Sequence, residues 1–492
     1  MESRLLRSTV QPIGMLCVRA EYRIGLTVSE DCSPIFRLQV RNFGLAARLG
    51  SLTGLSRASG DFGERHKMTH GFGTRTTFRL ALAGCLLSSL GGGTSWAQSL
   101  GDIQTAKAGE TAIPAPDPML GDGGTGPFYQ WDGAIPNGPP QIIKIERFQS
   151  KHALAEAALS ERIMYTSLGG PDGKQPIIVT GAVYLPKGPK PAGGWPIIAW
   201  AHGTVGLPDT CAPSFNGWSA RDVEYLNNWL RQGYAVVASD YEGMGTNGPH
   251  PYMISRSAAV GTLHAVLAAQ PRYPLSNNVV IVGQSQGAHT AANSGLIQQE
   301  VAPSIKLRGV VLTGWPGTME MPALRMDQYD PWSVFYMRAL PTYAAIDPDF
   351  RPESVLTPEG RKTYETFLAG CGSAATRTFM ARGPVVNTLF TRDITPLETR
   401  AQPLRAYPPL RFKVPVFLGI GLADEQTFPR PTFDAAKRAC ALGSNIAIHM
   451  YPGFNHAGTV LRSQEDSLGW VKAVFGGKNP KGQCEKAVFP NE

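Results

Sequence analysis

The sequence has no Cys-x-x-Cys pair, no internal repeat and no apolar run long enough to cross a membrane. Its seven cysteines also lack the spacing to histidine that zinc sites use, so a structural metal is not expected. The stretch at 80–90 is apolar over about 11 residues, roughly half of what a membrane-spanning helix needs. These absences disfavour a repeat architecture, a zinc-held domain and a transmembrane anchor.

After residue 97, basic and acidic residues are nearly equal in number. The net charge is +8, from 46 Lys and Arg against 38 Asp and Glu. Residues 1–97 hold 12 of the basic and 6 of the acidic residues, which leaves 34 against 32 for the rest. No run of Lys or Arg follows residue 97, so binding to nucleic acid is not expected. The hydrophobic content of 42% is that of a globular protein that can bury a core.

A secretory signal peptide is predicted at residues 68–97. The segment begins at Met68, continues through two arginines into the apolar run 80–90, and ends in Ser-Trp-Ala at 95–97, a small-x-small cleavage site. We therefore expect translation to start at Met68, residues 1–67 to be an unstructured upstream extension, and the mature protein to be secreted or periplasmic.

Four cysteines remain in the expected mature chain: Cys211, Cys371, Cys440 and Cys484. An even number of cysteines in an exported protein predicts two disulfides, and four cysteines allow three pairings.

Short apolar runs alternate with helical stretches after a Gly-, Pro- and Asp-rich arm at 98–140. The expected strands are 176–186, 195–201, 234–240, 279–283, 307–314, 414–421 and 446–452. The expected helices are 219–233, 257–270, 288–302, 431–443 and 467–477. Nearly continuous apolar runs are typical of strands buried on both faces, so we predict an α/β fold with a mostly parallel, doubly wound sheet.

The alternation stops between residues 315 and 410, where 330–343 and 363–372 have helical apolar spacing. An irregular loop of that length is improbable inside a domain, so this segment is predicted to be an inserted helical cap. The core is accordingly expected in two parts, 141–314 and 411–492.

The motif Gly-Gln-Ser-Gln-Gly at 283–287 is the candidate catalytic feature. It lies between the expected strand 279–283 and the expected helix 288–302, which is the context of a nucleophile elbow that exposes Ser285. The N–H of Gln286 would then lie at a helix N-terminus, where it can donate to an oxyanion. A plain strand-to-helix turn is the alternative interpretation.

A serine nucleophile needs a base, and the base needs a carboxylate that holds its tautomer. Hydrolases with such an elbow carry the acid and then the histidine after the serine. Three histidines follow Gln286. His456 stands in a loop after the last expected strand and is the best candidate, whereas His289 in a helix and His449 in a strand are more typical of structural roles.

The candidate acid is Asp424, which follows the strand 414–421 at the carboxyl edge of the sheet, where sites of open α/β sheets lie. Its neighbour Glu425 is the reserve, and Asp434 lies inside the following helix. A second oxyanion donor is expected after the strand 195–201.

That donor is the backbone N–H of Thr204 or Gly203, in the loop that begins with His202. His202 precedes the nucleophile and is expected to shape the loop. The segment 243–248 spells Gly-x-Gly-x-x-Gly, but prolines at 249 and 251 prevent a helix from starting there, so dinucleotide binding is not expected.

The motifs WPIIAWAHGT, ASDYEGMGTNGPHPY and VVIVGQSQGAHTA, followed by the Asp424 and His456 loops, resemble the secretory lipase family of α/β-hydrolases over about residues 140–477. The resemblance implies a secreted carboxylic-ester hydrolase with a helical lid, which acts on lipid or other acyl esters. It also implies Ser285, Asp424 and His456 as the triad, with Gln286 and Thr204 as the oxyanion donors.

The family's disulfide pattern implies that Cys211 pairs with Cys371, which leaves Cys440 with Cys484. The elbow departs from the family where many members carry an aromatic residue or histidine before the serine, and no role is assigned to Gln284.

Together these features predict a serine esterase or lipase that works through an acyl-enzyme without metal or cofactor. We expect a monomer that takes an ester substrate and contacts a lipid interface transiently through the cap. The alternatives are an acyltransferase or peptidase on the same scaffold, or a non-catalytic binding module of the same fold.

Overall fold

The computed structural model describes residues 113–149, 152–484 and 486–490. The expected upstream extension and signal peptide lie outside these residues, as does the first part of the expected N-terminal arm. Among the described helices, none is long and apolar enough to cross a membrane.

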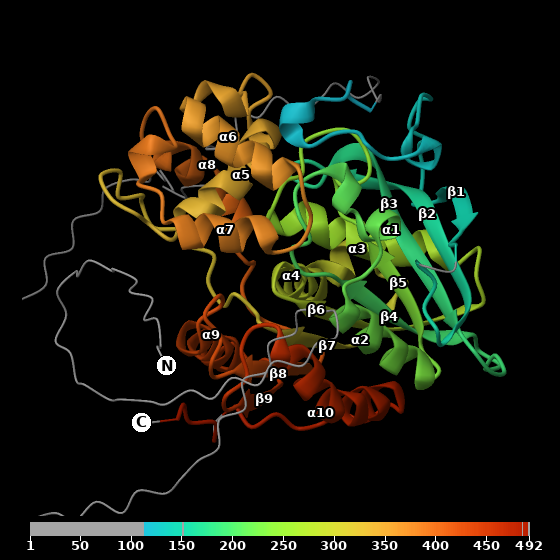
Figure 1. Ribbon diagram of the computed structural model, residues 1–492. Helices are drawn as coiled ribbons and strands as arrows, with labels where there is room; N and C mark the ends of the chain where they lie inside the picture. Colours follow the sequence, from blue (N-terminus) through green and yellow to red (C-terminus); the bar gives the residue numbers. More distant parts are fainter. Residues whose placement is uncertain (1–112, 150–151, 485, 491–492) are drawn as a thin grey trace, which may run out of the picture. The chain divides into compact units, whose positions relative to one another are not determined.

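A nine-stranded sheet forms the centre of the described chain (Figure 1). Its strands are β1 (Ile142–Arg147), β2 (Ala157–Gly169), β3 (Gln175–Pro186), β4 (Trp195–Ala201), β5 (Ala235–Ser239), β6 (Leu275–Gln284), β7 (Lys306–Thr313), β8 (Val416–Gly421) and β9 (Ile446–Tyr451). They are ordered β1-β2-β3-β5-β4-β6-β7-β8-β9. The pairs from β5 to β9 are parallel, and the pairs among β1, β2, β3 and β5 are antiparallel. The sheet is therefore mostly parallel, as predicted.

The parallel strands are largely apolar because both of their faces are covered. In β4, Ile197 and Ala199 belong to one hydrophobic core, while Ile198 and Trp200 belong to the core on the opposite face. Side chains alternate between the two faces of a strand, so a strand between two helical layers needs an apolar residue at every position.

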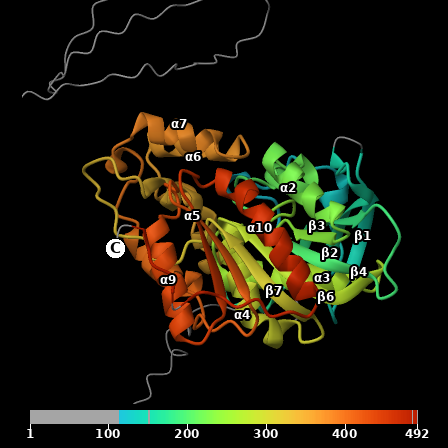
Figure 2. The same ribbon diagram turned by 90° about the horizontal axis from the view of Figure 1, so that it is seen from below.

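Helices cover both faces of the sheet. The core helices are α1 (Pro213–Asn216), α2 (Ala220–Arg231), α3 (Ser255–Ala269), α4 (Gln286–Val301), α9 (Pro429–Ala441) and α10 (Gly458–Phe475). Residues of α3, α4 and α9 pack into one core, whereas those of α2 and α10 pack into the other. Figure 2 shows α10 lying across its face of the sheet.

A separate group of helices lies between β7 and β8 in the sequence (Figure 1). It comprises α5 (Ser333–Ile346), α6 (Pro358–Leu368), α7 (Ala374–Arg382) and α8 (Thr395–Arg405). These helices pack around a hydrophobic core of their own, to which Tyr336, Leu340 and Phe390 contribute. We call this group the cap.

The first two strands and part of α10 were not foreseen. In β2, the polar run Ser160-Glu161-Arg162 interrupts the apolar pattern, and the buried Glu161 accepts a hydrogen bond from Tyr273 and pairs with Arg147. The helix α10 begins at Gly458, nine residues before the predicted start at 467. Its first turns contain the buried polar residues Thr459, Ser463 and Gln464, so apolar periodicity alone did not reveal them.

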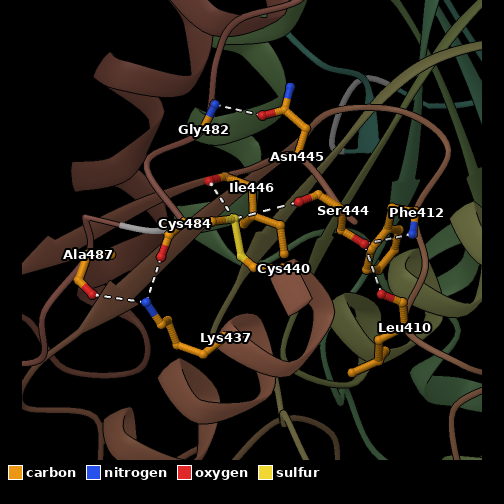
Figure 3. The surroundings of a disulfide bond; sticks show 10 residues. All are labelled: Leu410, Phe412, Lys437, Cys440, Ser444, Asn445, Ile446, Gly482, Cys484 and Ala487. Carbon is orange, nitrogen blue, oxygen red and sulfur yellow. Dashed lines mark hydrogen bonds between the residues drawn. A yellow bond between two sulfur atoms is a disulfide. The ribbon is translucent and has the colours of Figure 1, made fainter. Parts of the chain in front are cut away.

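Two disulfides link distant parts of the chain. Cys211, after β4, is bonded to Cys371 in the cap. Cys440, at the end of α9, is bonded to Cys484 in the C-terminal segment (Figure 3). That segment contacts the start of β9, where the Sγ of Cys484 lies 3.6 Å from the carbonyl oxygen of Ile446.

Candidate active site

Ser285 lies in a sharp turn between β6 and α4. Its backbone has φ 58° and ψ −121°, a conformation that a non-glycine residue adopts only at a cost. The flanking glycines permit the turn: a Cβ on Gly283 would lie 2.0 Å from the carbonyl oxygen of Gly287, and one on Gly287 would lie 1.9 Å from that of Ala201. The Gly-x-Ser-x-Gly pattern is thus required by the close approach of three backbone segments.

The N-terminus of α4 follows the serine directly. Gln286 is the first helical residue, so its N–H has no acceptor within the helix and is available to a negatively charged group. The side chain of Gln286 lies 3.2 Å from the Nε2 of His250, and burial lowers the pKa of His250 to about 4. A neutral His250 therefore fixes the side chain of Gln286, which leaves only its backbone N–H for an oxyanion.

Asp424 and His456 are brought together from loops that follow β8 and β9. The Nδ1 of His456 lies 2.8 Å from the Oδ2 of Asp424, and both side chains are buried. Asp424 also accepts hydrogen bonds from the N–H groups of Gln426 and Thr427 and from the Thr427 hydroxyl. These bonds fix the carboxylate and, through it, the tautomer of His456 with its proton on Nδ1.

The hydrogen bonds around Asp424 control its charge. Burial alone would raise the pKa of Asp424, but the hydrogen bond and the charge of His456 and the two backbone N–H groups together lower it below its usual value. The reserve candidate Glu425 is exposed, and Asp434 pairs with Arg430 along α9. Asp424 is thus the carboxylate that the fold directs at His456.

The other histidines lie in different surroundings. The Nε2 of His289 is within 3.1 Å of the Ser255 hydroxyl and within 2.9 Å of the Arg405 carbonyl oxygen. His449 is half-buried and stacked on Phe417. Both arrangements are structural.

His202 is fully buried at the start of the loop after β4. Its Nδ1 is 2.7 Å from the Gly203 carbonyl oxygen, and its ring stacks on Tyr241. This loop lies against the elbow, because a Cβ on Gly203 would be 3.3 Å from the carbonyl oxygen of Gln284. The backbone of Gly203 and Thr204 is accordingly placed beside the turn that holds Ser285.

Thr204 is tied to the cap through Tyr252. The Thr204 Oγ1 is 2.9 Å from the Tyr252 hydroxyl, while the Tyr252 carbonyl oxygen accepts hydrogen bonds from Thr342 and Arg405 of the cap. Arg405 is itself buried in an ion pair with Glu398. The candidate oxyanion loop and the cap therefore form one hydrogen-bonded unit.

Two site residues were not predicted. Gly314, after β7, has φ 55°, and a Cβ there would lie 2.7 Å from the Cε1 of His456. Gln284, directly before the serine, is buried with its Nε2 3.0 Å from the Nε2 of His456. Within the described chain, Ser285 Oγ makes no hydrogen bond to His456. The polar residue that ends the buried strand β6 was the one available signal for Gln284.

The segment 243–248 forms turns in which Gly243, Gly245 and Gly248 all have positive φ, and the next helix begins only at Ser255. A dinucleotide-binding loop would lead directly from a strand into a helix, which this segment does not.

Comparison with known proteins adds independent information. Residues 219–483 match the sequence model of the secretory lipase family. Lipase A of Moesziomyces aphidis is 23% identical over 385 residues, which are 73% of this chain and 81% of that protein. Candida antarctica lipase A in its closed state superposes with a TM-score of 0.56 at 22% identity, over 71% of this chain and 85% of that one.

A second solved structure, the rice cell wall degrading esterase LipA from Xanthomonas oryzae, gives a TM-score of 0.51 at 19% identity. The match covers 69% of this chain and 98% of the esterase. At these identities the two structures support the fold of this chain. The match to the family model spans more than half of the sequence.

Proposed function

Since the chain belongs to the secretory lipase family and is an ester hydrolase with the α/β-hydrolase fold, we propose that Ser285, His456 and Asp424 are its catalytic triad. The observation that carries this proposal is the 2.8 Å contact between His456 and Asp424. The same His456 ring also contacts Gln284, the residue before Ser285. The chain order serine, acid, histidine agrees with such a triad.

In the first half-reaction, the Oγ of Ser285 attacks the ester carbonyl carbon while His456 accepts the serine proton at Nε2. The bond to the leaving alkoxide then breaks, and His456 gives the proton to that oxygen. Asp424 holds the imidazole through Nδ1 and stabilises the imidazolium. In the second half-reaction, water attacks the acyl carbon while His456 accepts a proton from the water. His456 then gives this proton to the Oγ of Ser285, which leaves as the carboxylic acid is released.

The negative charge that develops on the carbonyl oxygen needs donors that are already in place. The N–H of Gln286, at the start of α4, and a backbone N–H of the Gly203-Thr204 loop are the proposed donors. Loss of one such donor typically costs about 3–4 kcal/mol of transition-state stabilisation. Because Thr204 contacts Tyr252, the cap contributes to the alignment of this loop.

The direct test is Ser285→Ala in purified protein with short p-nitrophenyl esters as substrates. We expect turnover to fall to the level of the buffer control, with an unchanged circular dichroism spectrum. Retained turnover would show that another residue is the nucleophile.

We propose that the cap contacts the lipid interface when the substrate is a lipid. Met380 on α7 is a large apolar side chain of the cap that is 50% exposed. Met380→Glu should weaken binding to phosphatidylcholine vesicles without lowering turnover of a soluble ester. We expect a monomer, and light scattering of the purified protein measures its mass.

We propose that the protein is exported after cleavage behind Ala97. Its two disulfides fit an oxidising compartment, such as the periplasm or the extracellular medium. N-terminal mass analysis of the exported protein should give Gln98 as the first residue, and a mature form that retains residues before Met68 would contradict the expected start.

A further inference from the structure

Gln284 occupies a central position for which the proposed mechanism has no use. It is the last residue of β6, is 2% exposed, and its side chain lies between His456 and Arg221. Its Nε2 is 3.0 Å from the Nε2 of His456, and its Oε1 is 3.3 Å from the Nη2 of Arg221. Since each end of this buried amide has a partner, what the amide does to His456 depends on whether its NH₂ group or its oxygen faces the ring.

The orientation of this amide is determined by Arg221. A guanidinium group only donates hydrogen bonds, so the oxygen of Gln284 must face it and the NH₂ group must face His456. Asp222 holds Arg221 in place, with contacts of 2.9 Å to Nε and 2.7 Å to Nη2. Gly203 leaves the space that the oxygen needs, since a Cβ there would lie 2.3 Å from Oε1. The amide therefore cannot exchange its two ends.

His456 presents a lone pair to that NH₂ group. Asp424 accepts the hydrogen bond from Nδ1, so in the neutral ring Nε2 is the acceptor. Ser285 needs the same lone pair to lose its proton. In the resting structure of the described chain, the hydrogen-bond partner at Nε2 is Gln284 and not Ser285.

We propose that Gln284 is a positioning residue that holds the resting His456 ring at Nε2 until the Ser285 hydroxyl takes its place, and that cannot bind the ring again while Nε2 is protonated; this proposal rests on the triad above. The amide donates to the neutral Nε2 and so fixes the ring beside the serine. After the ring takes the serine proton, Nε2–H and the amide N–H are both donors and repel each other. The ring then turns its proton toward the oxygen of the leaving alcohol.

The groups that face His456 define the experiment. They are the carboxylate of Asp424, the hydroxyl of Thr427 at 3.5 Å, and Gln284 with the Arg221–Asp222 pair behind it. Asp424 is the carboxylate in direct contact with the ring. A second carboxylate at position 284 would place a negative charge where the structure has an amide donor.

The first variant is Gln284→Glu, measured with p-nitrophenyl butyrate from pH 5 to pH 10. A carboxylate would bind the protonated ring at Nε2 and hold its proton, so we expect at least about a hundredfold loss of kcat at pH 7 that diminishes as the pH rises. The acid limb of the pH profile should therefore move to higher pH. The matched control Gln299→Glu adds the same charge on the exposed end of α4 and should keep the profile of the unmodified enzyme.

The second variant is Gln284→Met, which keeps the volume and removes both hydrogen bonds. We expect kcat to fall about fivefold with KM within twofold, since one hydrogen bond to the base is lost and the substrate contacts remain. The acid limb should not move, in contrast to that of Gln284→Glu.

The results separate the two proposals. If Ser285→Ala is inactive while Gln284→Glu keeps both the rate and the pH profile of the unmodified enzyme, the triad stands and the role of Gln284 is refuted. If Ser285→Ala keeps its activity, the triad itself is refuted. Should Gln284→Glu fail to fold, Gln284→Met with unchanged kcat overturns the role of Gln284 on its own.

Discussion

The carboxyl group of Asp209 should make the protein less stable as the pH rises toward neutrality. Asp209 lies two residues before Cys211 and is 1% exposed. Its Oδ2 accepts a hydrogen bond from the N–H of Gly123, whereas its Oδ1 has no partner among the described residues. Burial, reinforced by the nearby charge of Asp122, raises the pKa of Asp209 from 3.8 to about 7.

The sign follows from proton binding. Between about pH 4 and pH 7 the folded protein keeps a proton on Asp209 that the unfolded chain has lost, so the free energy of unfolding falls as the pH rises through this window. Each pH unit is worth about 1.4 kcal/mol, which gives at most about 3 kcal/mol between pH 5 and pH 8. For a domain of this size that corresponds to a decrease of at most about 4 °C in Tm.

The perturbation is Asp209→Asn, which imitates the protonated carboxyl at every pH. Thermal melting followed by circular dichroism from pH 5 to pH 8 should show a smaller decrease in Tm for the variant than for the unmodified protein. Asp349→Asn, an exposed carboxylate in the cap, is the control and should melt in parallel with the unmodified protein. If Asp209→Asn also melts in parallel across this range, a buried protonated carboxyl at position 209 is refuted.

Four further changes have defined outcomes. Asp424→Asn should lower kcat by about 10⁴ with little change in KM, because the imidazole loses the group that holds its tautomer; steady-state kinetics measures this. Gly287→Ala should abolish activity and lower Tm, because its Cβ would lie 1.9 Å from the carbonyl oxygen of Ala201. Gly469 in α10 has open space around it, so Gly469→Ala should raise the free energy of unfolding by about 0.5–1 kcal/mol in a denaturant titration. Replacing Cys211 and Cys371 together by Ser should cost about 5 kcal/mol for a loop of 160 residues and lower Tm accordingly.

The parallel part of the sheet could be predicted because its strands are buried on both faces. An apolar side chain at every position, as in 195–201 and 279–283, is a local property of the sequence. The strand β2 could not be predicted in this way, since its buried Glu161 depends on a hydrogen bond from Tyr273, which is 112 residues away. A contact of that kind leaves no periodic pattern.

The same division applies to the site. The sequence predicted the candidate catalytic residues from their order along the chain and their positions after strands: Ser285, Asp424 and His456. The fold places Asp424 against His456. The contact between Gln284 and His456 joins residues 172 apart and depends on the direction of one side chain. That the triad performs the reaction remains a prediction that Ser285→Ala tests.

The disulfide between Cys440 and Cys484 has a consequence beyond the stability of α9. The strand β9 is at one end of the sheet, where unpaired backbone groups can recruit a strand from another molecule. The segment around Cys484 blocks this edge, since Gly482 packs on the backbone of Ile446 (Figure 3). The side chain of Gln483 also donates a hydrogen bond to the carbonyl oxygen of Ile448. Reduction of this bond would uncover the edge, so reduced protein should aggregate sooner than oxidised protein even where both are still folded.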